Sequence, residues 1–108
     1  VDVRPDGYAQ NIADGILRAR YRESSSNPSP MTPGEPYEFR IDLWATSHVF
    51  LPGHCIRVEV ASSNFPRFDR NLNTGGDQAT GTQFQTAQQT VLHDSKFRSH
   101  ILLPVISS

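Results

Sequence analysis

The stretch YEFRIDLW, residues Tyr37–Trp44, decides the fold class because it alternates apolar and charged side chains with the period of a β-strand. Its apolar residues share one predicted face and its charged residues share the other, where Trp44 also falls. The stretch CIRVEVA, Cys55–Ala61, repeats the alternation. The side chains predicted to point inward from this second stretch are Ile56, Val58 and Val60.

Turn signals separate further short segments of strand-like composition. Pro5-Asp6-Gly7 predicts a tight turn that joins Val1–Arg4 to Tyr8–Ile12 as a hairpin, since Pro presets its own φ and Gly tolerates a positive one. Strands are also predicted at Ile16–Tyr21, at Gln89–Asp94 and at Ile101–Ile106, the last apolar enough for burial on both sides. No sustained helical period interrupts this pattern, which therefore predicts an all-β fold, an antiparallel β-sandwich or barrel.

Length and charge narrow the class of protein. The chain has 108 residues, enough for one small domain, and 36% of them are hydrophobic, enough for a modest core. The net charge of -1 gives no electrostatic footprint for nucleic acid or an anionic membrane, and no apolar run is long enough to span a bilayer. Neither nucleic acid nor a membrane is therefore expected as a partner. The Ser- and Pro-rich segment Glu23–Pro36 is interpreted as a long connection inside one domain rather than a linker.

The single cysteine, Cys55, excludes an internal disulfide and a cysteine-rich zinc site, and no cofactor is expected. The first residues, VDVRPDG, lack both the pattern of a signal peptide and an initiator Met, so we expect the chain to begin within a longer protein. The compartment stays open, with the cytoplasm slightly favoured.

The loop NFPRFDRNLNTGGD, Asn64–Asp77, is the candidate functional segment. Its spacing D-x-N-x-N resembles the opening of a calcium-binding loop, but Thr74 stands where such a loop needs Gly, and Thr80 stands where it needs Glu. A metal site is therefore not expected. A self-bonded loop is the stronger interpretation, because Asp and Asn bond neighbouring backbone and Phe side chains can anchor a loop. The candidate contact residues are Asn64, Phe65, Phe68, Asp69, Asn71 and Asn73.

Nucleophilic catalysis finds little support. Ser62-Ser63 is the obvious serine cluster, but the chain has no G-x-S-x-G elbow to present a nucleophile. His48 and His54 flank a turn and could approach one another, yet no third metal ligand is indicated. The alternative function is that of a free-standing carbohydrate-binding module, with Trp44 and the loop phenylalanines as a platform for sugars.

The run LWATSHVFLPGHCIRVEVASSNFPRFDRNLNTG, Leu43–Gly75, resembles the C-terminal domain of the cocaine esterase and X-prolyl dipeptidyl-peptidase family of serine hydrolases. DVRPDG at Asp2–Gly7, DGILRARYR at Asp14–Arg22 and QTVLHDSKFRSHILLPVI at Gln89–Ile106 support the resemblance, which spans nearly the whole chain. Cys55 departs from the pattern, where arginine or another polar residue is expected.

The resemblance implies that residues 1–108 are the C-terminal part of an incomplete jelly-roll (galactose-binding-like) β-sandwich from a larger hydrolase. Family members also contain an α/β-hydrolase domain, which carries the catalytic Ser, Asp and His, and none of these maps onto this chain. The implied role is non-catalytic: to pack on the catalytic domain of the same parent chain and help shape its substrate cleft. A truncated sandwich exposes sheet edges, so we also expect the isolated segment to be unstable or to self-associate.

Overall fold

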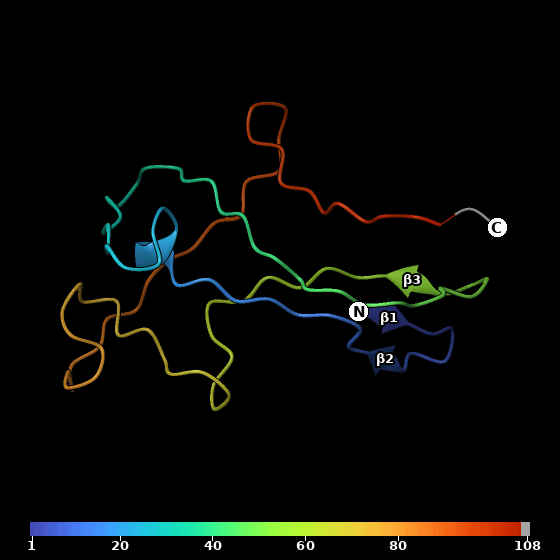
Figure 1. Cartoon of the computed structure of the whole chain (residues 1–108), viewed down its shortest axis with the longest axis horizontal. Coiled ribbons are helices and arrows are strands. Elements are labelled where there is room, and N and C mark those ends of the chain that lie inside the picture. Colours follow the sequence, from blue (N-terminus) through green and yellow to red (C-terminus); the bar gives the residue numbers. More distant parts are fainter. Residues whose placement is uncertain (107–108) are drawn as a thin grey trace. The chain divides into compact units, whose positions relative to one another are not determined.

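The computed structural model describes residues 1–106, which carry three short antiparallel strands and one short 3₁₀ helix (Figure 1). The chain divides into two compact units, Val1–Ala61 and Ser62–Ser108. All three strands belong to the first unit and form one sheet in the order β2-β1-β3. The predicted all-β class is confirmed, and the arrangement is consistent with an incomplete β-sandwich.

The predicted N-terminal hairpin is confirmed. Strand β1, Asp2–Val3, pairs antiparallel with β2, Ala9–Gln10, so that Asp2 lies opposite Gln10. Between them the Gly7 N–H donates to the Arg4 carbonyl over 2.9 Å, and Gly7 has φ of 88°. A positive φ is accessible to Gly without steric cost, so this residue type lets the chain reverse within three residues.

A pairing across half the chain completes the sheet. Strand β3, Cys55–Ile56, pairs antiparallel with β1 and places Ile56 opposite Asp2 (Figure 1). The bonding continues one step further, because Arg57 N donates to the Val1 carbonyl over 2.9 Å. Regular strand ends at Ile56, however, and so is much shorter than the predicted Cys55–Ala61.

The predicted strand Ile16–Tyr21 is wrong. Residues Ala19–Tyr21 form the 3₁₀ helix η1 instead, with the Tyr21 N–H donating to the Arg18 carbonyl over 2.8 Å. The Arg22 guanidinium stabilises this turn by donating from Nη1 to the Ala19 carbonyl over 3.1 Å. The Ala19 carbonyl thus accepts from a side chain, whereas in a strand it would accept from the backbone of a neighbouring strand.

The stretch Tyr37–Trp44 also forms no regular strand in the described chain. It lies beside Gly15, where an added Cβ would collide with the Asp42 carbonyl. It ends where Trp44 adopts φ of 63° and donates its N–H to Asp42 Oδ1 over 2.7 Å. A strand is defined by ladder hydrogen bonds to a neighbouring strand. Tyr37–Trp44 instead approaches the irregular backbone at Gly15, which offers no such ladder.

The segment Glu23–Pro36 belongs to the first unit, Val1–Ala61. The Ser29 N–H donates to the Arg20 carbonyl over 2.7 Å, and Arg22 Nη1 donates to the Ser29 carbonyl over 2.6 Å. The Thr32 N–H donates to the Tyr37 hydroxyl over 3.0 Å. These contacts tie the segment to its own unit, as expected of an internal connection.

The second unit contains turns and one isolated β-bridge, between His93 and Arg98. This bridge closes a turn in which Asp94 Oδ1 accepts from two backbone N–H groups, those of Lys96 and Phe97, each over 2.8 Å. The chain therefore reverses direction here, but the predicted strand Gln89–Asp94 is reduced to this single bridge.

Apolar side chains in the described residues are not buried. The predicted inward residues Ile56, Val58 and Val60 are 54%, 57% and 68% exposed, and Ile101–Ile106, predicted as a buried strand, is neither strand nor buried. Burial of a sheet face requires a second packed layer, which a single three-stranded sheet does not supply. No helix in the described part of the chain is long and apolar enough to cross a membrane.

Candidate functional site

The first half of the Asn64–Asp77 loop is closed on itself. The Phe68 N–H donates to the Asn64 carbonyl over 3.1 Å, forming a turn across Pro66. The Arg70 guanidinium lies over the Phe65 ring at 4.4 Å, and that of Arg67 lies over the Phe68 ring at 5.2 Å. Such cation–π contacts favour one orientation of each ring.

Phe65 does not anchor the loop to a core, since it is 55% exposed, whereas Phe68 is half-buried. Asn64 and Asp69 are exposed as well. The loop therefore presents an aromatic side chain and polar groups to its surroundings in a fixed arrangement.

The second half of the loop is held by its asparagines. Asn71 Oδ1 accepts from the Asn73 N–H over 3.1 Å and from Gln78 Nε2 over 3.3 Å. Asn73, with φ of 57°, donates from Nδ2 to the Gln85 carbonyl over 2.9 Å. Asn tolerates the left-handed conformation because its short side chain bonds locally, as here.

The bonding of these asparagines bears on the cation-binding interpretation of the loop. The Asn71 and Asn73 side chains serve as structural partners, and nowhere in residues 1–106 do three or more His, Cys, Asp or Glu side chains form a group that could hold a metal ion. The D-x-N-x-N spacing here produces a self-bonded loop, the stronger of the two interpretations drawn from the sequence.

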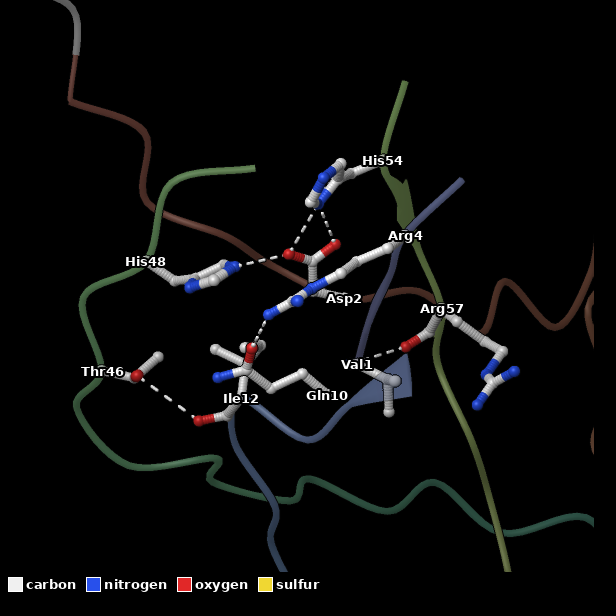
Figure 2. Close-up of polar contacts among 9 residues, drawn as sticks. All are labelled: Val1, Asp2, Arg4, Gln10, Ile12, Thr46, His48, His54 and Arg57. Carbon is white, nitrogen blue, oxygen red and sulfur yellow. Dashed lines mark hydrogen bonds and ion pairs between the residues drawn. The ribbon is translucent and has the colours of Figure 1, made fainter. Parts of the chain in front are cut away.

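A second polar cluster lies in the first unit, centred on Asp2 (Figure 2). His48 Nε2 lies 2.9 Å from Asp2 Oδ2, and His54 Nδ1 lies 2.9 Å from Asp2 Oδ1 and 3.0 Å from Oδ2. Asp2 is 2% exposed, and no other polar or charged residue in the described part of the chain is classed as buried. The sequence indicated that His48 and His54 could approach each other, but no local signal pointed to Asp2, which lies 46 residues before His48.

The carboxylate is ionised in this environment. Burial alone would raise the pKa of Asp2, but the hydrogen bonds from His54 and His48 outweigh burial, and the pKa lies below its ordinary value of 3.8. A pocket of about 350 Å³ adjoins the cluster. Besides Asp2 and the two histidines, the pocket is lined by Arg4, Gln10, Val49 and Leu51. Arg4 Nη2 donates to Gln10 Oε1 over 3.1 Å.

The groups considered for nucleophilic catalysis have structural partners. Ser63 Oγ accepts from the Phe65 N–H over 3.3 Å, and His100 Nδ1 donates to the Arg98 carbonyl over 2.6 Å. His48 and His54 are bonded to Asp2, as described above. None of these hydrogen bonds joins a serine to a histidine, as the nucleophile–base contact of a Ser–His–Asp triad requires.

The residues considered for sugar binding do not form one platform within a unit. Trp44 is 85% exposed and belongs to the first unit, whereas Phe65 and Phe68 belong to the second, each with an arginine over its ring. An exposed indole remains the feature of this chain that most resembles a sugar-binding surface.

Taken together, the sheet, the exposed apolar side chains and the self-bonded loop define a small all-β domain whose polar clusters serve structure. Residues 1–102 match the family described as the X-Pro dipeptidyl-peptidase C-terminal non-catalytic domain. The chain therefore belongs to this family, and it is a non-catalytic domain, as the resemblance implied.

Similar proteins include cocaine esterase from Rhodococcus sp. (strain MB1 Bresler), 52% identical over 108 residues that cover 98% of this chain and 19% of the esterase. Two provisionally named serine esterases, from Mycobacterium bovis and Mycobacterium tuberculosis, are each 33% identical over 84 residues, 62% of this chain and 13% of the esterase. The chain thus spans about a fifth or less of the length of these relatives. No solved structure matches it.

Proposed function

We propose that residues 1–108 act as the C-terminal β domain of a serine hydrolase, packing on an α/β-hydrolase domain of the same polypeptide. The observation that carries this proposal is the exposure of apolar side chains in a chain of this family: Ile56, Val58 and Val60 are all more than half exposed. Exposed apolar side chains in such number are typical of a domain that another part of the protein covers.

The reaction proposed for the whole protein is acyl transfer to water. A serine outside this chain attacks an ester or amide carbonyl, a histidine carries the proton, and water releases the acyl group. The names of the similar esterases support this class of reaction. Residues 1–108 supply no nucleophile or base to it, and their contribution is to cover the catalytic domain.

The Asn64–Asp77 loop is the proposed contact with the substrate cleft or the catalytic domain. Its backbone is held by Asn71 and Asn73, so binding against it costs little additional ordering entropy. It presents Phe65, more than half exposed, together with exposed Asn64 and Asp69. A preorganised loop with one exposed aromatic side chain fits a contact surface between domains.

The test is Phe65→Ser in the complete gene product, with Ser25→Ala, in the exposed Ser- and Pro-rich segment, as the matched control. Ester hydrolysis and the melting temperature are measured for both. A cleft contact predicts a raised KM or lowered kcat at an unchanged melting temperature, and a domain contact predicts a lowered melting temperature. If Phe65→Ser behaves like Ser25→Ala in both measurements, the loop is remote from the hydrolase and this part of the proposal is wrong.

The wider proposal has its own test. Genetic removal of residues 1–108 from the complete gene product should abolish stable folding or lower esterase activity strongly, because the proposed contact face of the catalytic domain becomes exposed. A truncated protein with full activity and an unchanged melting temperature would contradict the accessory role.

The carbohydrate-binding alternative rests on Trp44, which is 85% exposed. It predicts saturable quenching of Trp44 fluorescence by a soluble glycan, reduced by Trp44→Ala. The accessory role predicts no such quenching.

A further inference from the structure

Asp2 is the one described polar residue whose burial requires a dedicated partner set. A buried carboxylate costs free energy unless hydrogen bonds replace its lost hydration. Here both replacing donors come from one short segment, HVFLPGH, in which His48 and His54 flank the turn at Pro52-Gly53. The carboxylate therefore joins β1 to the His48–His54 turn, across about half of the chain (Figure 2).

The chemistry of this junction fixes the protons on both rings. An ionised carboxylate only accepts hydrogen bonds, so His48 must carry a proton on Nε2, and His54 must carry one on Nδ1. Neutral imidazole has a single N–H, and each ring places it toward the carboxylate. The junction thus needs no charge on either histidine, but it does need the charge on Asp2.

Other charged groups near Asp2 do not replace these donors. Arg4 lines the same pocket, but its Nη2 is hydrogen-bonded to Gln10 Oε1 at 3.1 Å. Arg57, which follows β3, directs its side chain away from the carboxylate (Figure 2) and pairs with Glu59 Oε1 at 2.7 Å. Within the first unit, the two histidines are the groups bonded to the Asp2 carboxylate.

We propose that Asp2, His48 and His54 form an acid-released latch that holds the His48–His54 turn on β1. The latch is closed while the carboxylate is ionised, because both of its oxygens then accept from imidazole N–H groups. A proton on the carboxyl removes the negative charge and turns one oxygen into a donor that meets an N–H, so the latch opens and β3 loses its support. This device is independent of the proposed function, because it depends on residues of the first unit alone.

The test is amide hydrogen exchange in the complete gene product, followed at two amides that report the closed state. The His54 N–H donates to the Leu51 carbonyl over 3.0 Å, and the Arg57 N–H donates to the Val1 carbonyl over 2.9 Å. Asp2→Asn, which imitates the protonated carboxyl, should raise exchange at both amides by about tenfold or more at neutral pH. Asp6→Asn is the matched control: Asp6 accepts from the Tyr8 N–H in the neighbouring turn, and its change should leave both amides protected.

A second pair of variants separates the hydrogen bond from ring packing, and it applies even if Asp2→Asn fails to fold. His48→Gln keeps an N–H donor and loses the ring, whereas His48→Phe keeps a ring and loses the donor. The latch predicts protection in the Gln variant and rapid exchange in the Phe variant. Protection in the Phe variant would overturn the proposal. So would protection factors in the unmodified protein, taken relative to the intrinsic exchange rate at each pH, that do not fall once acid protonates Asp2.

Discussion

The Arg22 guanidinium carbon lies 4.5 Å from the centroid of the Tyr37 ring, joining the end of η1 to the end of the Ser- and Pro-rich segment. The same side chain donates to the Ala19 and Ser29 carbonyls and pairs with Glu23 Oε1 at 3.1 Å. Its side chain is 6% exposed. One guanidinium, largely enclosed by its neighbours, therefore organises a segment that has little secondary structure of its own.

Replacing Arg22 with Ala should destabilise this part of the first unit by about 2 kcal/mol, because partly buried carbonyl acceptors lose a charged donor. The measurement is exchange of the Ser29 N–H, which donates to the Arg20 carbonyl over 2.7 Å. Arg40→Ala is the control, since Arg40 is 89% exposed and pairs only with exposed Glu38, and it should leave Ser29 protected. Equal exchange in the two variants would show that Arg22 does not organise the segment.

Gly53→Ala should destabilise the turn before β3 by roughly 1–2 kcal/mol, since Gly53 has φ of 85° and a Cβ there is strained. Added bulk is a minor factor, because the new Cβ would meet Pro5 Cγ at an ordinary 3.4 Å. Chemical denaturation of the complete gene product measures the effect, with Gly53→Asn as the comparison. Asn tolerates a positive φ better than Ala, so an Asn variant less stable than the Ala variant would contradict this explanation.

The pH dependence of stability follows from Asp2. Its pKa is lowered on folding, so its contribution to the free energy of unfolding is fully present above 3.8, the ordinary value. The contribution is lost as pH falls through the still lower pKa of the folded state. The Asp2→Asn variant should be less stable than the unmodified protein at neutral pH and should lose less stability as the pH falls. Denaturation midpoints measured across pH test both results. An unchanged acid profile in the variant would assign the loss to other carboxylates.

Val58→Asp should reduce self-association of the isolated 108-residue chain, because Val58, like Ile56 and Val60, is an apolar side chain that is more than half exposed. Light scattering at increasing concentration is the measurement. Ser25→Asp adds the same charge at an exposed position without removing an apolar side chain, and it should have the smaller effect. A monodisperse, stable monomer of the unmodified chain would contradict the expectation of self-association itself.

The same Val58→Asp change should act in the opposite sense in the complete gene product. If the surface at Val58 is covered in the complete gene product, the buried charge lowers stability by at least about 2 kcal/mol. Thermal denaturation distinguishes this result from the near-zero effect expected of an uncovered surface residue.

Local chemistry made part of this protein predictable from its sequence. Pro5-Asp6-Gly7 and Pro52-Gly53 each contain a residue whose backbone preference matches the turn it forms, and both turns are present. The Asn-rich loop bonds to itself because Asn71 and Asn73 carry donors and acceptors on short side chains near their own backbone. The all-β class and the family followed from alternation and from the order of several motifs, and both are confirmed.

Only the tertiary structure decided which alternating stretches pair and which do not. Tyr37–Trp44 carries the clearest strand pattern and forms no ladder, whereas the weaker pattern at Asp2–Val3 occupies the centre of the sheet. The Asp2–His48–His54 cluster was equally hidden, because its members lie 46 and 52 residues apart along the chain. Alternation records a preference for one buried face, but strand pairing and a buried carboxylate depend on partners distant in sequence, and only folding brings those partners together.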